Sequence, residues 1–284
     1  MAVKYSVIIP VYNEEKAITK TVNAVKEVMK NYSYELITVN DCSKDRTGQI
    51  LKQIKGIRVI NHPVNKGYGA SIKSGIRASE GEWIIITDAD GTYPIGDIPK
   101  LIAYTNEYDM VVGARTGKKV QVPLMRRPAK WALKLVARIV TGVRILDINS
   151  GLRIFRKEMA LRFWNIFPQG FSFTTTITIA ALSNNYSVKY IPINYFKREG
   201  SSTIKPLKDF IGFNLLTFKV ALYFAPLKFF IPTSILIFLI GAAKAIMDFV
   251  SGGRIGTFAA IAVLFSVQIF FFGLLADLVN KRTP

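Results

Sequence analysis

The stretch Trp83-Ile84-Ile85-Ile86-Thr87-Asp88-Ala89-Asp90-Gly91 decides the fold, because an apolar run ends there in two carboxylates one residue apart. The run does not alternate polar and apolar residues, which predicts a strand covered on both faces in a parallel sheet. Asp88 and Asp90 then lie at the carboxyl end of this strand, where open α/β sheets bind ligands. Two hard oxygen ligands at this spacing suit a divalent cation holding a diphosphate. The simpler alternative is a solvated turn, since Asp and Gly are ordinary turn residues.

Short apolar runs alternate with amphipathic segments on either side of this stretch. We predict strands at residues 4–10, 34–40, 57–61, 83–87 and 110–114, with helices between them, the first over about 14–29. This alternation predicts a doubly wound, mostly parallel sheet. A polar or glycine-containing loop follows each strand, so several loops meet at one edge of the sheet, as they do in nucleotide sites. A helix at 171–182 and a strand at 188–193 follow later, after a polar loop at 147–153.

The composition limits the class of protein. The chain has 284 residues, a formal net charge of +19 and 50% hydrophobic residues, a combination that indicates membrane association and contact with anionic lipid or phosphate. A single cysteine, Cys42, and a single histidine, His62, exclude an intrachain disulfide and a Cys/His zinc site. We interpret His62, which precedes Pro63, as a turn residue. No signal peptide precedes the first predicted strand, so we expect the N-terminal domain to be cytoplasmic.

Two segments have the composition of helices that lie in a membrane interface. In residues 115–145, basic residues recur every four positions from Arg126 to Arg138 and leave a broad apolar remainder. This pattern predicts a basic amphipathic interfacial helix, although a surface helix packed on the sheet has a similar pattern. Residues 207–228 are a second candidate for an interfacial helix.

The C-terminal region is strongly apolar. Residues 229–243 and 255–276 carry no charge, and the second run has about the length that a bilayer core requires. We predict a two-helix transmembrane hairpin over 229–284, with two buried helices of a soluble core as the alternative. Lys and Arg are more frequent at its two ends than at its turn, which places both ends in the cytoplasm. Because the basic residues lie beside the membrane segments, the charge pattern argues against a nucleic-acid partner.

Three loop motifs together resemble the inverting nucleotide-sugar glycosyltransferases with a GT-A fold. These motifs are Pro10-Val11-Tyr12-Asn13-Glu14-Glu15, Asn40-Asp41-Cys42-Ser43-Lys44-Asp45 and Asp88-Ala89-Asp90-Gly91. Two later segments, 147–153 and 198–202, resemble the polyprenyl-phosphate branch of this family, typified by dolichyl-phosphate mannose synthase. The resemblance covers residues 4–205. It implies a Rossmann-like GT-A domain over 1–206, followed by an interfacial helix and the transmembrane hairpin.

The resemblance also implies a role for each matching residue. Mg²⁺ or Mn²⁺ would be held against the diphosphate by Asp88 and Asp90. Nucleotide-sugar binding is implied for Pro10, Tyr12, Glu14, Asp41, Asp88 and Asp90. Binding of the acceptor phosphate is implied for Arg115, Ser150, Arg198, Ser201 and Lys205. Catalytic roles are implied for Asp90, Arg115, Asp147 and Arg198.

Three positions depart from the family pattern. The family usually has a second Asp where Asn40 stands and a glycine where Cys42 stands. The mannose synthase branch often supplies a Gln as a third metal ligand where Thr92 stands, which leaves that ligand in question here.

The implied activity is transfer of one hexose from GDP-mannose, UDP-glucose or UDP-N-acetylglucosamine to dolichyl or another polyprenyl phosphate. It would take place on the cytoplasmic face of the cell membrane or an endomembrane. A phosphate monoester is already anionic near neutral pH, so this acceptor needs surrounding cations rather than a general base. Two alternatives stay open: a transferase to a glycan hydroxyl in surface polysaccharide synthesis, and a non-enzymatic membrane scaffold with a transferase fold. The sugar, the lipid and the oligomeric state, a homo-oligomer included, also stay open.

Overall fold

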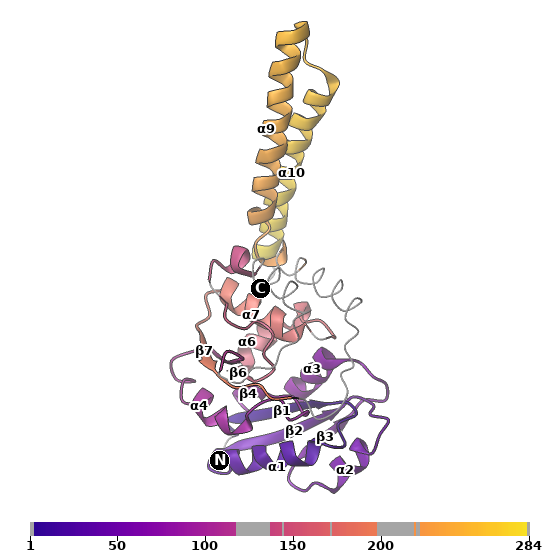
Figure 1. Ribbon diagram of the computed structural model, residues 1–284, viewed down its shortest axis with the longest axis vertical. Coiled ribbons are helices and arrows are strands. Elements are labelled where there is room, and N and C mark those ends of the chain that lie inside the picture. Colours follow the sequence, from indigo (N-terminus) through magenta and orange to yellow (C-terminus); the bar gives the residue numbers. More distant parts are fainter. Residues whose placement is uncertain are drawn as a thin grey trace. The chain divides into compact units, whose positions relative to one another are not determined.

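The computed structural model describes residues 3–117, 137–143, 145–170, 172–197, 219 and 222–282. The chain divides into two compact units, Met1–Thr217 and Phe218–Pro284. The first unit contains a β-sheet with helices on both faces, and the second is a pair of long helices (Figure 1).

A seven-stranded sheet with the order β3-β2-β1-β4-β6-β5-β7 forms the centre of the first unit. Strands β1 to β4 are parallel to one another, and β7 is parallel to β5. The exception is β6, which runs antiparallel to both of its neighbours, β4 and β5. The strands are β1 (Tyr5–Val11), β2 (Tyr34–Asn40), β3 (Arg58–Asn61), β4 (Trp83–Ile86), β5 (Met110–Ala114), β6 (Arg153–Arg156) and β7 (Val188–Pro192).

The mostly parallel sheet expected from the sequence is confirmed, but β6 was not expected. Its four residues begin and end with arginine, so the sequence shows no apolar run that marks a strand. Helix α1 (Ile18–Met29) also begins later than predicted. Glu14 and Glu15 instead form a turn whose backbone N–H groups donate to Thr47 and Asp45.

Helices cover both faces of the sheet (Figure 1). Successive residues of β1 point to opposite faces, so Val7 and Ile9 pack in the core with α1, whereas Ile8 faces α3. Gly75 on α3 permits this contact, because an added Cβ would lie 2.5 Å from Ile8 Cγ2. On the α1 face lie α2 (Thr47–Gln53) and α4 (Ile98–Ile102), with the 3₁₀ turn η1 (Ile95–Asp97); the other face carries α3 (Tyr68–Ala78), α6 (Lys157–Arg162), α7 (Phe173–Ser183) and the 3₁₀ turn η3 (Trp164–Ile166).

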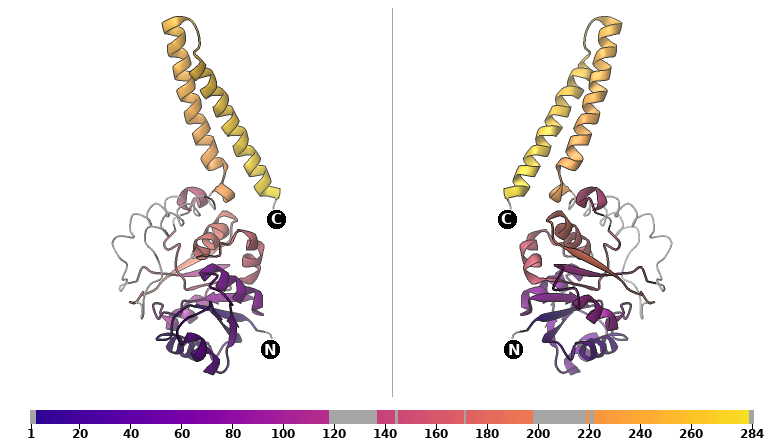
Figure 2. Two further views of the ribbon diagram at one scale, coloured as in Figure 1. Left: turned by 90° about the vertical axis from the view of Figure 1, so that its right-hand side faces the viewer. Right: turned by 90° about the vertical axis from the view of Figure 1, so that its left-hand side faces the viewer.

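The second unit is a hairpin of α9 (Leu227–Gly252) and α10 (Thr257–Arg282), which lie side by side (Figure 2). Each helix is long and apolar enough to cross a bilayer. Small residues bring the helices together: a Cβ on Gly273 would lie 2.6 Å from Phe230 Cβ. The Ser234 hydroxyl donates to the Ser266 carbonyl oxygen at 3.0 Å. The apolar helix pair predicted from the sequence is therefore confirmed.

The predicted interfacial helices at 115–145 and 207–228 fall largely outside the described residues. Of the first, residues 137–141 are helical. Both segments stay predictions.

Candidate active site

The loop after β4 carries Asp88 and Asp90 at the carboxyl end of the parallel strands, as the sequence predicted. Asp90 is 7% exposed and Asp88 is half-buried. The Tyr68 hydroxyl, at the start of α3, donates to Asp88 Oδ1 at 3.0 Å. Thr92 donates to Asp90 Oδ1 through its backbone N–H at 3.1 Å and through its hydroxyl at 2.6 Å. These bonds orient both carboxylates. No motif in the sequence pointed to Tyr68.

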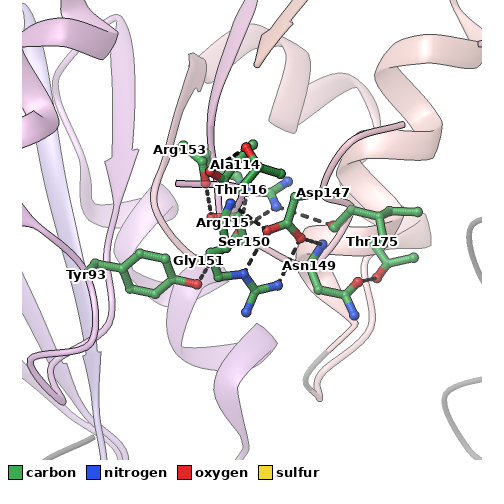
Figure 3. Close-up of polar contacts among 12 residues, drawn as sticks. Tyr93, Ala114, Arg115, Thr116, Asp147, Asn149, Ser150, Gly151, Arg153 and Thr175 are labelled. Carbon is green, nitrogen blue, oxygen red and sulfur yellow. Dashed lines mark hydrogen bonds and ion pairs between the residues drawn. The ribbon is translucent and has the colours of Figure 1, made fainter. Parts of the chain in front are cut away.

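The loop that leads into β6 comes directly against the acidic pair. A Cβ on Gly151 would lie 2.8 and 2.9 Å from the carboxylate oxygens of Asp88, so a larger residue does not fit. The Gly151 N–H donates to the Tyr93 hydroxyl at 2.6 Å, and the Ser150 hydroxyl donates to the Gly113 carbonyl oxygen at 2.5 Å (Figure 3). These contacts bring the motif at 147–153 next to the motif at 88–91, although the two lie far apart in the sequence.

Arg115 and Asp147 form a bidentate ion pair in this loop cluster (Figure 3). Arg115 Nε lies 2.7 Å from Asp147 Oδ2, and Nη2 lies 2.9 Å from Oδ1. The backbone N–H of Arg115 also donates to Oδ2 at 3.0 Å. Both side chains are 12% exposed, and the guanidinium lies 5.1 Å from the ring centroid of Tyr195. The sequence nominated both members of this pair but did not predict that they bind each other.

The ion pair sets the charge state of Asp147. Burial would raise the pKa of its carboxyl group, but the hydrogen bonds and the positive charge of Arg115 lower that pKa to about 2. At neutral pH, Asp147 is therefore an anion with little affinity for a proton. A side chain in this state is a weak general base.

Arg153, the first residue of β6, anchors the same loop from within the sheet. This side chain is completely buried in β6. Its Nε donates to the Ser150 carbonyl oxygen at 2.9 Å, and Nη1 donates to the Thr174 carbonyl oxygen at 2.8 Å and the Thr178 hydroxyl at 2.9 Å. The threonine-rich helix α7 thus supplies acceptors for a buried cation. The sequence placed Arg153 in a polar loop and gave no sign of its burial.

The residues nominated for the nucleoside pocket follow the first two strands. Pro10 is buried within β1, Tyr12 is half-buried just beyond it, and Glu14 is 7% exposed. Asp41 follows β2 and is also buried. All four therefore lie at or beyond the carboxyl ends of parallel strands, as expected for a ligand site.

Asp41 is held by the loop that follows β3. Its Oδ1 lies 2.6 Å from His62 Nδ1 and accepts the Lys66 N–H at 2.8 Å, while Oδ2 accepts the Gly67 N–H at 2.7 Å. His62 Nε2 lies 2.8 Å from the Ser74 hydroxyl oxygen. The interpretation of His62 as a turn residue was thus incomplete: the ring is buried and links Asp41 to α3. The sequence signal for this role was the position of His62 directly after β3, at the sheet edge where Asp41 follows β2.

The glycine-containing loop before α3 packs against the backbone of Pro168, Gln169 and Gly170. The N–H groups of Gly69 and Ala70 donate to the carbonyl oxygens of Gly170 and Gln169 at 3.1 and 2.9 Å. A Cβ on Gly69 would lie 2.3 Å from the Pro168 carbonyl oxygen. These amides at the start of α3 therefore serve packing and do not form a phosphate cradle.

The donor set at the acidic pair fits Mg²⁺ or Mn²⁺. Carboxylate oxygens suit these hard cations, and Mg²⁺ is commonly bound by one or two carboxylates with water and substrate phosphate completing its shell. Within the described residues, no group of three or more His, Cys, Asp and Glu side chains is placed to hold a metal ion. Thr92 donates its hydroxyl to Asp90, which leaves Asp88 and Asp90 as the candidate protein ligands. The nominated Arg198, Ser201 and Lys205 lie outside the described residues.

Comparison with known proteins identifies the family. The model for glycosyl transferase family 2 matches residues 6–167, and a model described as the GtrB C-terminal hairpin matches residues 225–281. A dolichyl-phosphate beta-glucosyltransferase of Trichomonas vaginalis is 30% identical over 70% of this chain and 68% of its own length. An undecaprenyl-phosphate mannosyltransferase of Micrococcus luteus is 26% identical over 68% of this chain and 83% of its own length.

A solved structure shows the same fold. Glucosyl-3-phosphoglycerate synthase from Mycobacterium tuberculosis, in complex with Mn²⁺, UDP and phosphoglyceric acid, matches 78% of this chain and 78% of its own with a TM-score of 0.61 and 17% identity. At this identity the likeness concerns the fold alone. Together with the family match, it confirms the sequence-based identification: the chain belongs to glycosyl transferase family 2 and has the GT-A fold.

Proposed function

We propose that this protein transfers one hexose from a nucleotide diphosphate sugar to a polyprenyl phosphate at a membrane surface. The observation that carries the proposal is the ion pair between Arg115 and Asp147, beside the loop that contacts Asp88. It offers a fixed cation and a carboxylate too weakly basic to activate a hydroxyl. This chemistry favours an acceptor that is already ionised. Relatives named as dolichyl-phosphate and undecaprenyl-phosphate glycosyltransferases support the same acceptor class.

The donor end would use the acidic pair. Asp88 and Asp90 would hold Mg²⁺ or Mn²⁺ against the diphosphate, with their carboxylates oriented by Tyr68 and Thr92. When bound, the cation offsets the negative charge on the departing diphosphate. Pro10, Tyr12, Glu14 and Asp41 would line the nucleoside pocket.

The acceptor end would use the arginine. A phosphate monoester has a second pKa of about 6 and is mostly a dianion at neutral pH. Asp147 engages Nε and one N–H of Nη2, so three of the five guanidinium donors lie outside the ion pair and can meet phosphate oxygens. Ser150 fixes the loop at 147–153 through its hydrogen bond to the Gly113 carbonyl oxygen. Arg198, Ser201 and Lys205 would complete the anion site. The acceptor oxygen attacks the anomeric carbon while the bond between that carbon and the diphosphate oxygen breaks. This single displacement inverts the configuration of the anomeric carbon.

The hairpin of α9 and α10 would anchor this reaction at the bilayer. We propose a cytoplasmic catalytic domain over 1–206, interfacial helices at 115–145 and 207–228, and a transmembrane hairpin over 229–284. A greater number of Lys and Arg at the two ends of the hairpin than at its turn supports this orientation. The lipid tail would stay in the bilayer while its phosphate reaches the sheet edge.

The test is transfer from labelled GDP- and UDP-sugars to dolichyl and undecaprenyl phosphates by the full chain, with label read in the organic phase. We expect organic-phase label for one donor class, in the presence of Mg²⁺ or Mn²⁺. Label that appears only on water-soluble glycans would instead establish a hydroxyl acceptor. No transfer for any pairing, with the folded protein and either metal, would refute the proposal and favour a scaffold.

A further inference from the structure

A basic cavity lies on the α3 and α6 face of the sheet. It has a volume of about 510 Å³ and is lined by Ile76, Arg77, Lys157, Leu161 and Trp164. Arg77 lies nine positions after Tyr68 on α3, or about 14 Å along the helix axis. The cavity is therefore separate from the acidic pair that Tyr68 contacts, and no role proposed above uses it.

Two cations from α3 lie over the Trp164 indole: Arg77, which lines the cavity, and Lys73, which does not line it. Lys73 Nζ is 4.8 Å and Arg77 Cζ is 5.3 Å from its ring centroid, both within the range of cation–π attraction. Lys73 also donates to the Trp164 carbonyl oxygen at 3.3 Å, which holds the ring and the ammonium together. A third cation, Lys157, donates to the Ser79 carbonyl oxygen. The cluster is thus built by contacts between α3, α6 and η3.

Among the described residues, no carboxylate balances the positive charges of the cluster. Within the described part of the chain, no carboxylate lines the cavity and no ion pair involves Lys73, Arg77 or Lys157. Glu158 follows Lys157 but is exposed and does not line the cavity. Burial, and then the charge of Arg77, lower the pKa of Lys73. Like charges held together in this way favour an anion as the missing partner.

We propose that this cavity binds the phosphate headgroup of an anionic phospholipid and thereby docks the catalytic domain on the bilayer. Leu161, 50% exposed, and half-buried Trp164 supply apolar surface beside the cations. Indole and aliphatic groups rimmed by Lys and Arg are the composition that membrane interfaces favour. The inference rests on the proposed membrane attachment through α9 and α10. It concerns a bulk membrane lipid and not the polyprenyl acceptor.

The experiment measures how accessible Trp164 is to a neutral quencher. The full chain is incorporated into nanodiscs of phosphatidylcholine, alone or with about 30% phosphatidylglycerol, an anionic lipid of the kind that attracts basic segments. Acrylamide quenching of wild type minus that of Trp164→Phe isolates this tryptophan from the other two in the chain. We expect its quenching constant to fall about twofold or more in the anionic nanodiscs, because the headgroups cover the indole.

Charge variants establish whether the cavity causes the protection. Lys73→Gln/Arg77→Gln should abolish the difference between the two nanodiscs. The matched control Lys52→Gln/Lys55→Gln removes two exposed charges, one in α2 and one just after it, and should keep the difference. Circular dichroism confirms that each variant is folded.

Any of four results would overturn the inference. One is equal Trp164 accessibility in both nanodiscs, and another is protection that persists in Lys73→Gln/Arg77→Gln. The third is protection by inorganic phosphate in neutral nanodiscs with no further effect of phosphatidylglycerol, which would assign the cavity to a free anion. A chain that fails to co-elute with nanodiscs would refute the membrane attachment as well, whereas co-elution with unchanged accessibility refutes this inference alone.

Discussion

Replacement of Asp147 by Asn distinguishes an orienting carboxylate from a general base. In the proposed reaction Asp147 holds Arg115 and does not accept a proton from the acceptor. We expect Asp147→Asn to reduce kcat by no more than about tenfold, because Arg115 stays in place with a weaker partner. Loss of a true general base would cost roughly 10²–10⁴-fold. Asp90→Asn should be far more harmful, by a hundredfold or more, since it removes a carboxylate proposed to hold the cation.

The same replacement has a separate effect on stability, whose size follows from the pKa. A fall from 3.8 to about 2 corresponds to about 2 kcal/mol of folding free energy, for a side chain that is 12% exposed. Because the pKa is lower in the folded state, this contribution is complete above about pH 4 and is lost as the pH falls through about 2. The stability difference between wild type and Asp147→Asn should therefore be about 2 kcal/mol at pH 7 and shrink over this acid range.

Two assays on the full chain separate these effects. Steady-state transfer of labelled sugar, with donor and acceptor varied in turn, gives kcat and both KM values. Urea unfolding at several pH values gives the stability. Asp109→Asn is the matched control, since Asp109 is also paired with an arginine, Arg156, at 3.3 Å, but at the opposite end of β5 from Arg115. It should leave kcat unchanged. A loss of about 10²-fold or more in kcat for folded Asp147→Asn, with both KM values unchanged, would refute the orienting role and favour a base mechanism.

Three further predictions follow from the site. Gly151→Ala should weaken metal-dependent donor binding tenfold or more, because the added Cβ would lie 2.8 Å from Asp88 Oδ1. The donor-induced thermal shift measures this binding, with Gly96→Ala as control because its Cβ meets nothing within 4 Å; equal shifts for the two variants would contradict the prediction. Arg153→Lys should lower the free energy of unfolding by about 3 kcal/mol through lost charged hydrogen bonds, whereas Arg156→Lys at the other end of β6 should cost much less in the same urea titration. Chelation by EDTA should abolish transfer and added Mn²⁺ or Mg²⁺ should restore it; full activity in EDTA would exclude the proposed metal role.

The features predicted correctly from the sequence are those encoded over short distances. The apolar run before Asp88 marked a buried strand, and the strands at Tyr34–Asn40 and Met110–Ala114 match their predicted bounds. The apolar helices α9 and α10 were equally plain, because a run long enough to span a bilayer needs no information about neighbouring segments. The joint pattern of loop motifs also identified the family.

The sequence alone determined which strand ends carry acids and amides, and that an apolar helix pair follows the catalytic fold, because periodicity and apolar runs are local properties. Only the tertiary structure decided that Arg115 pairs with Asp147 across 32 positions, that Arg153 is buried in an antiparallel strand, and that Lys73 and Arg77 converge on Trp164. Each of these depends on which segments the sheet brings together. The sequence does not record whether a charged side chain faces water, another charge or a buried carbonyl group. The chemistry of that side chain depends on which of these it faces.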